Sequence, residues 1–233
     1  YIFCCAGQRK GPRKQGATLK FSKKELKGFF NFRQDMATRL ILVRHGETLW
    51  NAQKRYCGST DIGLSAKGKK QARRLKEKLN GMSIHKIYTS CRKRAIQTAK
   101  IIFQGAKINN MPDLNEMHFG IFEGLTYREI MKRYPWIYSA WLKRPFCVVI
   151  PKSESLDTFR KRVIRALKKI IFVNKNKTVA IVCHGGPISV FVAVILKTND
   201  FWKYIPHSAS ISIVEYRNGS LEIKALNDIT HLN

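Results

Sequence analysis

The chain has 233 residues, enough for one large domain or for a domain with an appendage. Apolar residues make up 44% of it, which predicts a buried core and excludes wholesale disorder. The 44 Lys and Arg outnumber the 15 Asp and Glu, and the net charge of +29 is typical of proteins that handle polyanions. Basic residues on the solvated faces of helices are a simpler explanation of the same charge.

The cysteines and the apolar runs indicate the compartment. The six Cys show neither paired metal-ligand spacing nor the density of a small secreted scaffold. The longest apolar run, from Ile188 to Leu196, is about half of what spans a bilayer. We therefore expect a cytoplasmic protein without a membrane partner.

Residues 1–37 differ in composition from the rest of the chain. The stretch from Gly7 to Lys20 is rich in Gly, Lys, Arg and Gln, and Met36 stands just before the first strong strand pattern. We expect residues 1–37 to be a flexible basic extension and residues 38–233 to form the folded domain. One hypothesis is that the functional protein begins at Met36.

The first half of the domain alternates strand, loop and helix. The apolar run from Arg39 to Val43 predicts a buried strand that stops at Arg44-His45-Gly46. Ser65 suits the N-cap of a helix that runs to about Leu79, with Gly81 as its C-terminal stop. A short strand over residues 85–88 and a helix over residues 92–103 follow.

The second half repeats this alternation. Apolar residues at three- and four-residue steps predict an amphipathic helix over residues 155–172. Residues 178–183 predict a second buried strand, and Pro187 suits the first turn of the next helix. Alternating strands over residues 210–216 and 221–226 form a predicted hairpin. The chain is therefore predicted to be α/β, a single three-layer domain with a mostly parallel sheet flanked by helices.

Two predicted buried strands end in the same way, one at His45-Gly46 and the other at His184-Gly185. Ligands of open α/β sheets bind outside the carboxyl ends of the strands, so both histidines are expected at that edge. Glycine allows close backbone approach, and a helix N-terminus near Pro187 suits an anion. Either motif alone is equally compatible with a structural loop histidine.

Two further motifs lie between the histidine motifs, namely Ser90-Cys91-Arg92-Lys93-Arg94-Ala95 and Leu114-Asn115-Glu116-Met117-His118-Phe119-Gly120. Together with Arg44-His45-Gly46-Glu47-Thr48 and His184-Gly185, in this order, they resemble the histidine phosphatase superfamily. This group contains the cofactor-dependent phosphoglycerate mutases and related small phosphatases. The resemblance covers about Thr38 to the C-terminus. One departure is Ser153-Glu154-Ser155, where the family often has Gly-Glu-Ser, so the turn before the long helix is expected to differ.

The resemblance implies roles for the matched residues and implies no metal or other cofactor. His45 is the implied nucleophile, which forms a phosphohistidine, and Glu116 is the implied proton donor. A phosphomonoester dianion repels a nucleophile unless cations and N–H donors hold its oxygens. The residues implied to hold the phosphate are Arg44, Asn51, Arg94, Gly185 and a protonated His184.

Several residues keep two interpretations. Glu123 is the rival of Glu116 for the role of acid, although the family places the acid at Glu116. His118 and His207 are each either substrate contacts or structural residues. We expect structural roles for His85 and His231.

The short span between Glu116 and His184 resembles the compact phosphatases rather than the mutases. We therefore predict a metal-independent, histidine acid-type phosphatase that hydrolyses a small phosphorylated metabolite. The segments 117–120, 184–187 and 226–232 look like those of α-ribazole phosphatases, which act on a late intermediate of cobalamin synthesis. This makes α-ribazole 5′-phosphate the predicted substrate.

Two alternatives belong to other functional classes. One is a phosphoglycerate mutase-type phosphotransferase, which needs a bisphosphate primer. The other is a non-catalytic scaffold whose basic surface binds nucleic acid or another polyanion nonspecifically. The intact set of Arg44, His45, Arg94, Glu116 and His184 argues against the scaffold. The oligomeric state is left open, with a homodimer as one option.

Overall fold

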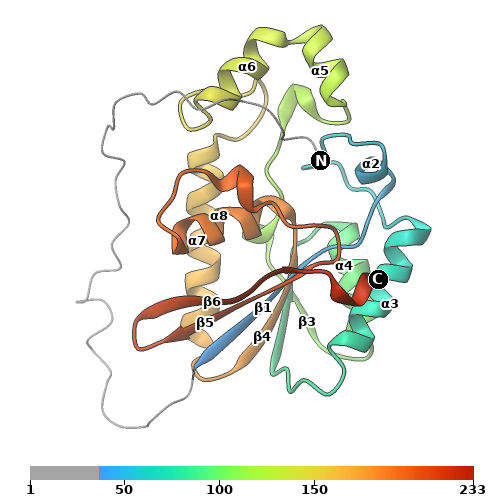
Figure 1. Ribbon diagram of the computed structural model, residues 1–233, viewed down its shortest axis with the longest axis vertical. Helices are drawn as coiled ribbons and strands as arrows, with labels where there is room; N and C mark the ends of the chain where they lie inside the picture. The colour runs from blue at the N-terminus through green and yellow to red at the C-terminus, as the bar shows by residue number, and fades with distance from the viewer. Residues whose placement is uncertain (1–36) are drawn as a thin grey trace. The chain divides into compact units, whose positions relative to one another are not determined.

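A computed structural model describes residues 37–233, which contain a six-stranded sheet between two layers of helices (Figure 1). The expected extension over residues 1–37 lies, except for Ala37, outside the described residues. The strand order is β3-β2-β4-β1-β5-β6, with parallel pairing from β3 to β1 and antiparallel pairing from β1 to β6. The strands are β1 (Thr38–Arg44), β2 (Lys86–Thr89), β3 (Ile108–Asn110), β4 (Thr178–Cys183), β5 (Ile211–Arg217) and β6 (Ser220–Asp228). The α/β prediction of a mostly parallel sheet is confirmed.

Two pairs of helices cover the two faces of the sheet (Figure 1). One face is covered by α7 (Leu156–Val173) and α8 (Gly185–Ile195), and the other by α3 (Ala66–Lys78) and α4 (Lys93–Ile102). Three shorter helices lie above the carboxyl ends of the parallel strands, namely α2 (Leu49–Ala52), α5 (Tyr127–Arg133) and α6 (Pro135–Lys143). No helix within residues 37–233 has the length and apolarity needed to cross a bilayer.

Burial on both faces explains why the central strands are almost entirely apolar. Leu40 and Leu42 of β1 point into the core on the α7 side, while Ile41 and Val43 point into the core on the α3 side. All four side chains are at most 1% exposed. The core on the α7 side also contains Trp141 of α6, so α6 is anchored to the same domain.

The elements that the sequence patterns did not predict are short. β3 has three residues, α2 has four and α5 has seven, which is too few to show a periodic apolar pattern. Local signals for α5 and α6 do exist, because Thr126 caps α5 through its side chain and Pro135 begins α6. Pro187 lies in the first turn of α8, which begins at Gly185, as expected.

The loop after β1 and the start of α3 pack backbone against backbone. A Cβ on Gly68 would lie 2.0 Å from the carbonyl oxygen of Glu47, and a Cβ on Gly46 would lie 2.5 Å from that of Gly68. Any side chain at either position therefore forces the helix and the loop apart. The position of His45 and of the residues that follow it depends on this contact.

We expect Gly68→Ala to lower the free energy of unfolding by about 1–3 kcal/mol, because the added methyl group overpacks this contact. Urea denaturation measures the change. Gly81→Asn is the control: Gly81 has φ +78°, a Cβ added there would meet no atom within 4 Å, and Asn tolerates a left-handed backbone. A Gly68→Ala protein as stable as the wild type would contradict the close approach.

Candidate active site

A cavity of about 150 Å³ opens beyond the carboxyl ends of β1 and β4. Five of the predicted site residues line it: Arg44, His45, Asn51, Glu116 and Gly185. The rest of its wall is largely apolar and is formed by Met117, Phe119, Phe159, Phe201, Trp202 and Ile205, with Arg55, Cys57 and Gly186. The sheet, α8 and the segments above the sheet together enclose this site.

The pairing of β1 with β4 places the two histidines side by side. Arg44 is in register with Cys183, so the next residues, His45 and His184, leave neighbouring strands at the same level. Their ring centroids are 5.1 Å apart. The backbone N–H of His45 also donates to the carbonyl of Cys183 at 3.0 Å, which fixes the chain just beyond the strand.

The ring of His45 has a defined tautomer. Nδ1 lies 2.7 Å from the carbonyl oxygen of Gly46, and because a carbonyl only accepts, Nδ1 carries the hydrogen. Burial holds the pKa of His45 well below 6.5, and the cations of Arg94 and Arg44 lower it further. The ring is therefore neutral, with an unprotonated Nε2.

His184 and Arg94 lie behind the residues that line the cavity and are not part of its lining. Arg94 Nε donates to His184 Nδ1 at 3.2 Å, and His184 Nε2 lies 2.7 Å from the hydroxyl of Ser90. The other guanidinium nitrogens of Arg94 donate to the carbonyls of Cys57, Gly58 and Thr60. Arg94 therefore orients His184 and holds the loop over residues 57–60.

The resemblance implies a protonated His184 that holds a phosphate, and this stays a prediction; the described surroundings of His184 favour the neutral ring. Burial lowers the pKa of His184 well below 6.5, and Arg94 and His45 lower it further. Nδ1 also serves as the acceptor for Arg94, and this bond requires an unprotonated nitrogen. Burial and this hydrogen bond both favour a neutral His184.

Arg44 and Asn51 present donors to the cavity. The buried Nε of Arg44 has no hydrogen-bond partner within residues 37–233, while Nη1 donates to the carbonyl of Pro206. The Asn51 Oδ1 accepts from the backbone and the hydroxyl of Thr48 in a capping box at the start of α2. Its amide nitrogen is thus the group that can donate to a ligand.

Glu116 also lines the cavity, and its carboxyl group lies against the start of α8. Oε2 accepts from the backbone N–H of Gly186 at 3.1 Å, and Oε1 accepts from that of Met117 at 3.0 Å. Burial raises the pKa of Glu116, although these hydrogen bonds and the two arginines lower it in part. A carboxyl group with a raised pKa is suited to donate a proton.

Comparison with known proteins agrees with this geometry. Residues 40–229 match the histidine phosphatase superfamily (branch 1). The chain belongs to this superfamily. Phosphoserine phosphatase 1 of Hydrogenobacter thermophilus is 32% identical, over 83% of this chain and 94% of its own.

Two further relatives extend the comparison. The adenosylcobalamin/alpha-ribazole phosphatase of Escherichia coli K12 is 28% identical, over 81% of this chain and 95% of its own. The solved structure of Bacillus stearothermophilus YhfR is 30% identical, covers 84% of this chain and all of its own, and superposes with a TM-score of 0.79. The relatives thus share the superfamily but differ in the substrates that their names state.

Glu123, the rival acid of this histidine phosphatase, has a different environment. Burial by itself raises the pKa of Glu123, but hydrogen bonds outweigh this effect and the net pKa is lowered. Its carboxylate accepts from the backbone of Gly58, Ser59 and Phe119 and from the hydroxyl of Thr60. It is an ionised group that ties together two loops.

The remaining histidines lie outside the cavity wall. His118 Nδ1 accepts from the N–H of Gly120, and His207 pairs with Asn227. His231 contacts the carbonyl of Ala209, and His85 Nδ1 accepts from Thr178, in keeping with structural roles. No cluster of potential metal ligands occurs within residues 37–233.

Sequence patterns did not point to most of the apolar wall. Phe201 and Trp202 belong to a short 3-10 helix after α8, and Ile205 directly follows it. Arg55 follows α2 and reaches the cavity while paired with Glu129 at 2.8 Å. None of these residues stands in a periodic pattern, so only the fold reveals their position.

The two neutral histidines predict a pH dependence of stability. In the unfolded chain each ring takes up a proton as the pH falls through about 6.5, whereas the folded protein resists this. Their contribution to stability is therefore complete above that pH and is lost as the pH falls below it. We expect His45→Asn to flatten the dependence of the unfolding free energy between about pH 5 and 6.5 by up to about 1.4 kcal/mol per pH unit.

Denaturant titrations at several pH values measure this slope. His85→Asn, which makes the same substitution at an exposed histidine outside the cavity, is the control for the substitution itself. Glu116 acts with the opposite sign at lower pH, and both variants retain it. An equal slope in the wild type and in His45→Asn would contradict the neutral, buried ring.

Proposed function

We propose that this chain hydrolyses phosphomonoesters through a phosphohistidine on His45. The observation that carries the proposal is the state of the His45 ring, in which the Gly46 carbonyl holds the Nδ1 hydrogen and Nε2 is left unprotonated. A buried imidazole in this state needs no base to activate it. It lines the same cavity as Arg44 and Glu116.

The reaction has two steps. Nε2 of His45 attacks phosphorus, the bond from phosphorus to the ester oxygen breaks, and protonated Glu116 gives its proton to the leaving alkoxide. In the second step Glu116 takes a proton from water as the water oxygen attacks phosphorus. The phosphorus–nitrogen bond breaks, phosphate leaves, and both residues return to their starting states.

The phosphate oxygens are held by Arg44, by the amide of Asn51 and by the N-terminus of α8 at Gly185. The unpartnered Nε of Arg44 supports its part in this, because a buried donor without a partner is costly and a ligand oxygen would satisfy it. An arriving dianion favours protonation of His184, which then supplies a further positive charge. Arg94 acts from behind by orienting His184.

For the substrate we retain α-ribazole 5′-phosphate, supported by the aromatic wall at Phe201 and Trp202. A flat aromatic group attached to the phosphate ester can stack on such a wall. Phosphoserine is a second candidate, supported by the name of the Hydrogenobacter relative and by Arg55, whose guanidinium at the cavity can hold a carboxylate.

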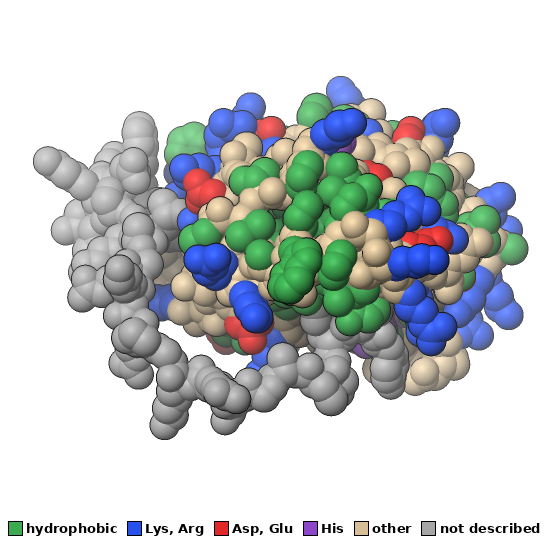
Figure 2. Space-filling model, turned by 90° about the horizontal axis from the view of Figure 1, so that it is seen from above, with side chains coloured by type: hydrophobic (Ala, Val, Ile, Leu, Met, Phe, Trp, Pro, Cys, Tyr) green, Lys and Arg blue, Asp and Glu red, His purple; other side chains and the backbone are tan. Residues whose placement is uncertain are grey.

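The polyanion scaffold receives little support from the face of the molecule that Figure 2 shows. Figure 2 looks onto the end of the molecule where α5 and α6 lie, and there the Lys and Arg side chains surround an apolar centre. Trp136 of α6 is 86% exposed and Tyr127 of α5 is 43% exposed. A nucleic-acid surface is expected to show a continuous basic stripe instead.

His45→Ala should abolish phosphate release, since it removes the nucleophile from a loop beyond β1 without opening the core between sheet and helices. The assay compares α-ribazole 5′-phosphate, phosphoserine, 3-phosphoglycerate and p-nitrophenyl phosphate, with a chelator present to test metal independence. Circular dichroism checks that the variant is folded. Substantial activity in His45→Ala would overturn the assignment, and turnover that requires a bisphosphate primer would favour the mutase.

Glu116→Gln should lower kcat/KM by about 100-fold or more for alkyl phosphates, whose alkoxide must be protonated as it leaves. The loss for p-nitrophenyl phosphate should be much smaller, because nitrophenolate leaves without a proton. Steady-state kinetics on both esters give the ratio. Glu123→Gln is the control and should lower kcat/KM equally for both esters, since Glu123 holds two loops together. Equal losses of kcat/KM for the two esters in Glu116→Gln would exclude Glu116 as the acid.

A further inference from the structure

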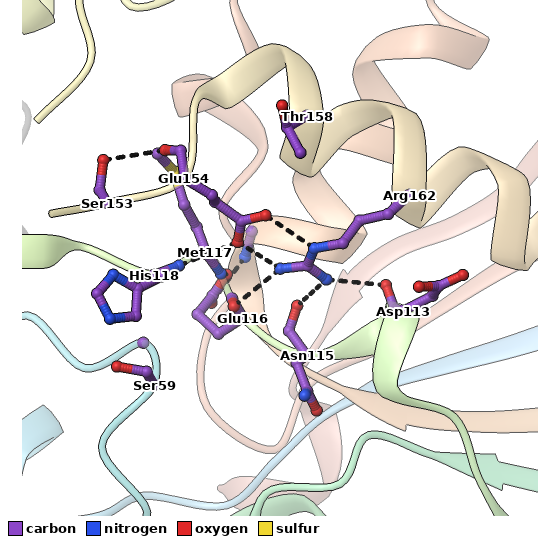
Figure 3. A network of polar contacts seen from close by, with 12 residues as sticks. Ser59, Asp113, Asn115, Glu116, Met117, His118, Ser153, Glu154, Thr158 and Arg162 are labelled. Carbon is purple, nitrogen blue, oxygen red and sulfur yellow. Dashed lines mark hydrogen bonds and ion pairs between the residues drawn. The ribbon is translucent and has the colours of Figure 1, made fainter.

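Arg162 of α7 donates to the backbone of the segment around Glu116 and to the side chain of Glu154 (Figure 3). Nη1 donates to the carbonyls of Asp113 and Asn115 at 2.9 and 2.8 Å. Nη2 donates to the carbonyl of Glu116 at 3.1 Å and to Glu154. Nε completes the set with a second bond to Glu154 at 2.9 Å. The guanidinium group offers five donors, and all are used.

Glu154 extends this grip to the other side of the acid. While one oxygen pairs with Nε of Arg162, Oε1 accepts both from Nη2 of Arg162 and from the backbone N–H of His118 at 3.1 Å. The side chains of Arg162 and Glu154 are only 17% and 19% exposed. The backbone on both sides of Glu116 is therefore held by one half-buried, bidentate ion pair.

The same guanidinium group lies 4.9 Å from the ring centroid of Phe159, which lines the cavity. The Glu116 carboxyl has its own bonds to Gly186 and Met117, but where these bonds can form is decided by the backbone of residues 113–118. The charge of Glu154 offsets that of Arg162. A cation can thus hold the carbonyl of Glu116 without an uncompensated charge beside the acid.

We propose that Arg162 and Glu154 are positioning residues that hold the Glu116 carboxyl group at the leaving oxygen of the substrate. The inference rests on the proposed function, in which Glu116 is the proton donor. Catalysis by a general acid is sensitive to the position of the proton, and a displacement of about 1 Å can cost about 100-fold in rate. We call the Arg162–Glu154 ion pair the clamp. Its loss therefore lowers the rate for esters whose leaving group needs the proton more than the rate for esters whose leaving group does not.

The chain offers a matched control on the same helix. Arg165 also reaches the segment before Glu116, but it contacts the side chain of Asp113 at 3.1 Å rather than the backbone, and its side chain is 73% exposed. An exposed pair of this kind contributes little. Arg165→Met removes a cation of the same size from α7 and leaves the clamp in place.

The experiment measures kcat/KM for an alkyl phosphate and for p-nitrophenyl phosphate in Arg162→Lys, Arg162→Met, Glu154→Gln and Arg165→Met. The ratio of the two values should fall about 10- to 100-fold in Arg162→Met. Arg162→Lys keeps the charge but not the fork of donors, and it should give a smaller fall in the same direction. Arg165→Met should leave the ratio unchanged. If Arg162→Met does not fold, Arg162→Lys and Glu154→Gln give the result.

A double variant separates positioning from general damage. In the Glu116→Gln background, Arg162→Lys should lower the ratio no further, because the acid that it positions is already absent. Equal losses for both esters in the Arg162 and Glu154 variants, or a further fall in the double variant, would overturn the proposal. If Glu116→Gln alone leaves the ratio unchanged, the assignment of the acid fails and this proposal fails with it; if only the Arg162 and Glu154 variants leave it unchanged, the acid stands and the clamp does not.

Discussion

The parallel pairing of β1 with β4 is the constraint on which the rest of the site depends. Because Arg44 and Cys183 are in register, both strands end at one level and deliver His45 and His184 with ring centroids 5.1 Å apart. Both faces of these two strands are covered by helices, and the interior residues of the pair are apolar for that reason. A slip of one residue would turn Leu40 and Leu42 toward the opposite layer and separate the histidines.

Removal of water from this edge sets the charge state of each group. Burial keeps the pKa of His45 and His184 low and that of Glu116 high, so a neutral His45 lines the same cavity as a carboxyl group whose proton is held more firmly than usual. The two buried arginines act in the same direction on the histidines and against burial on Glu116. In the mechanism proposed above, an anionic substrate raises the pKa of His184, so that the site gains its full positive charge only when a phosphate offsets it.

Two kinds of feature could be predicted from the sequence: elements with a regular apolar pattern, and motifs whose residues are contiguous in the chain. Strand β1, strand β4 and helix α7 are predicted by their apolar patterns. The motifs at Arg44, Glu116 and His184 are recognisable because each is a short contiguous segment and the three occur in a fixed order. The aromatic wall could not be predicted in this way, because Phe201 and Trp202 reach the cavity only through the path of the chain between α8 and β5. The hydrogen bonding of Arg94 is also invisible in the sequence. Its donors go to His184 and to three carbonyls of the loop over residues 57–60, which is a property of how that loop folds back over the sheet edge.

Multidentate contacts between charged side chains and backbone recur around the site. Arg94 donates to backbone carbonyls of the loop over residues 57–60, and Glu123 accepts from backbone N–H groups of the same loop. Arg162 donates to backbone carbonyls of the segment that carries Glu116. A buried charge is tolerated only when hydrogen bonds satisfy it, and the polar backbone of an irregular loop needs partners for the same reason. In these loops the charged side chains and the backbone groups that lack a partner in a helix or strand satisfy one another. The loops are thereby fixed next to His45, His184 and Glu116. Close to the site, Glu116, Glu123 and Glu154 each accept backbone N–H groups and so act as internal ties.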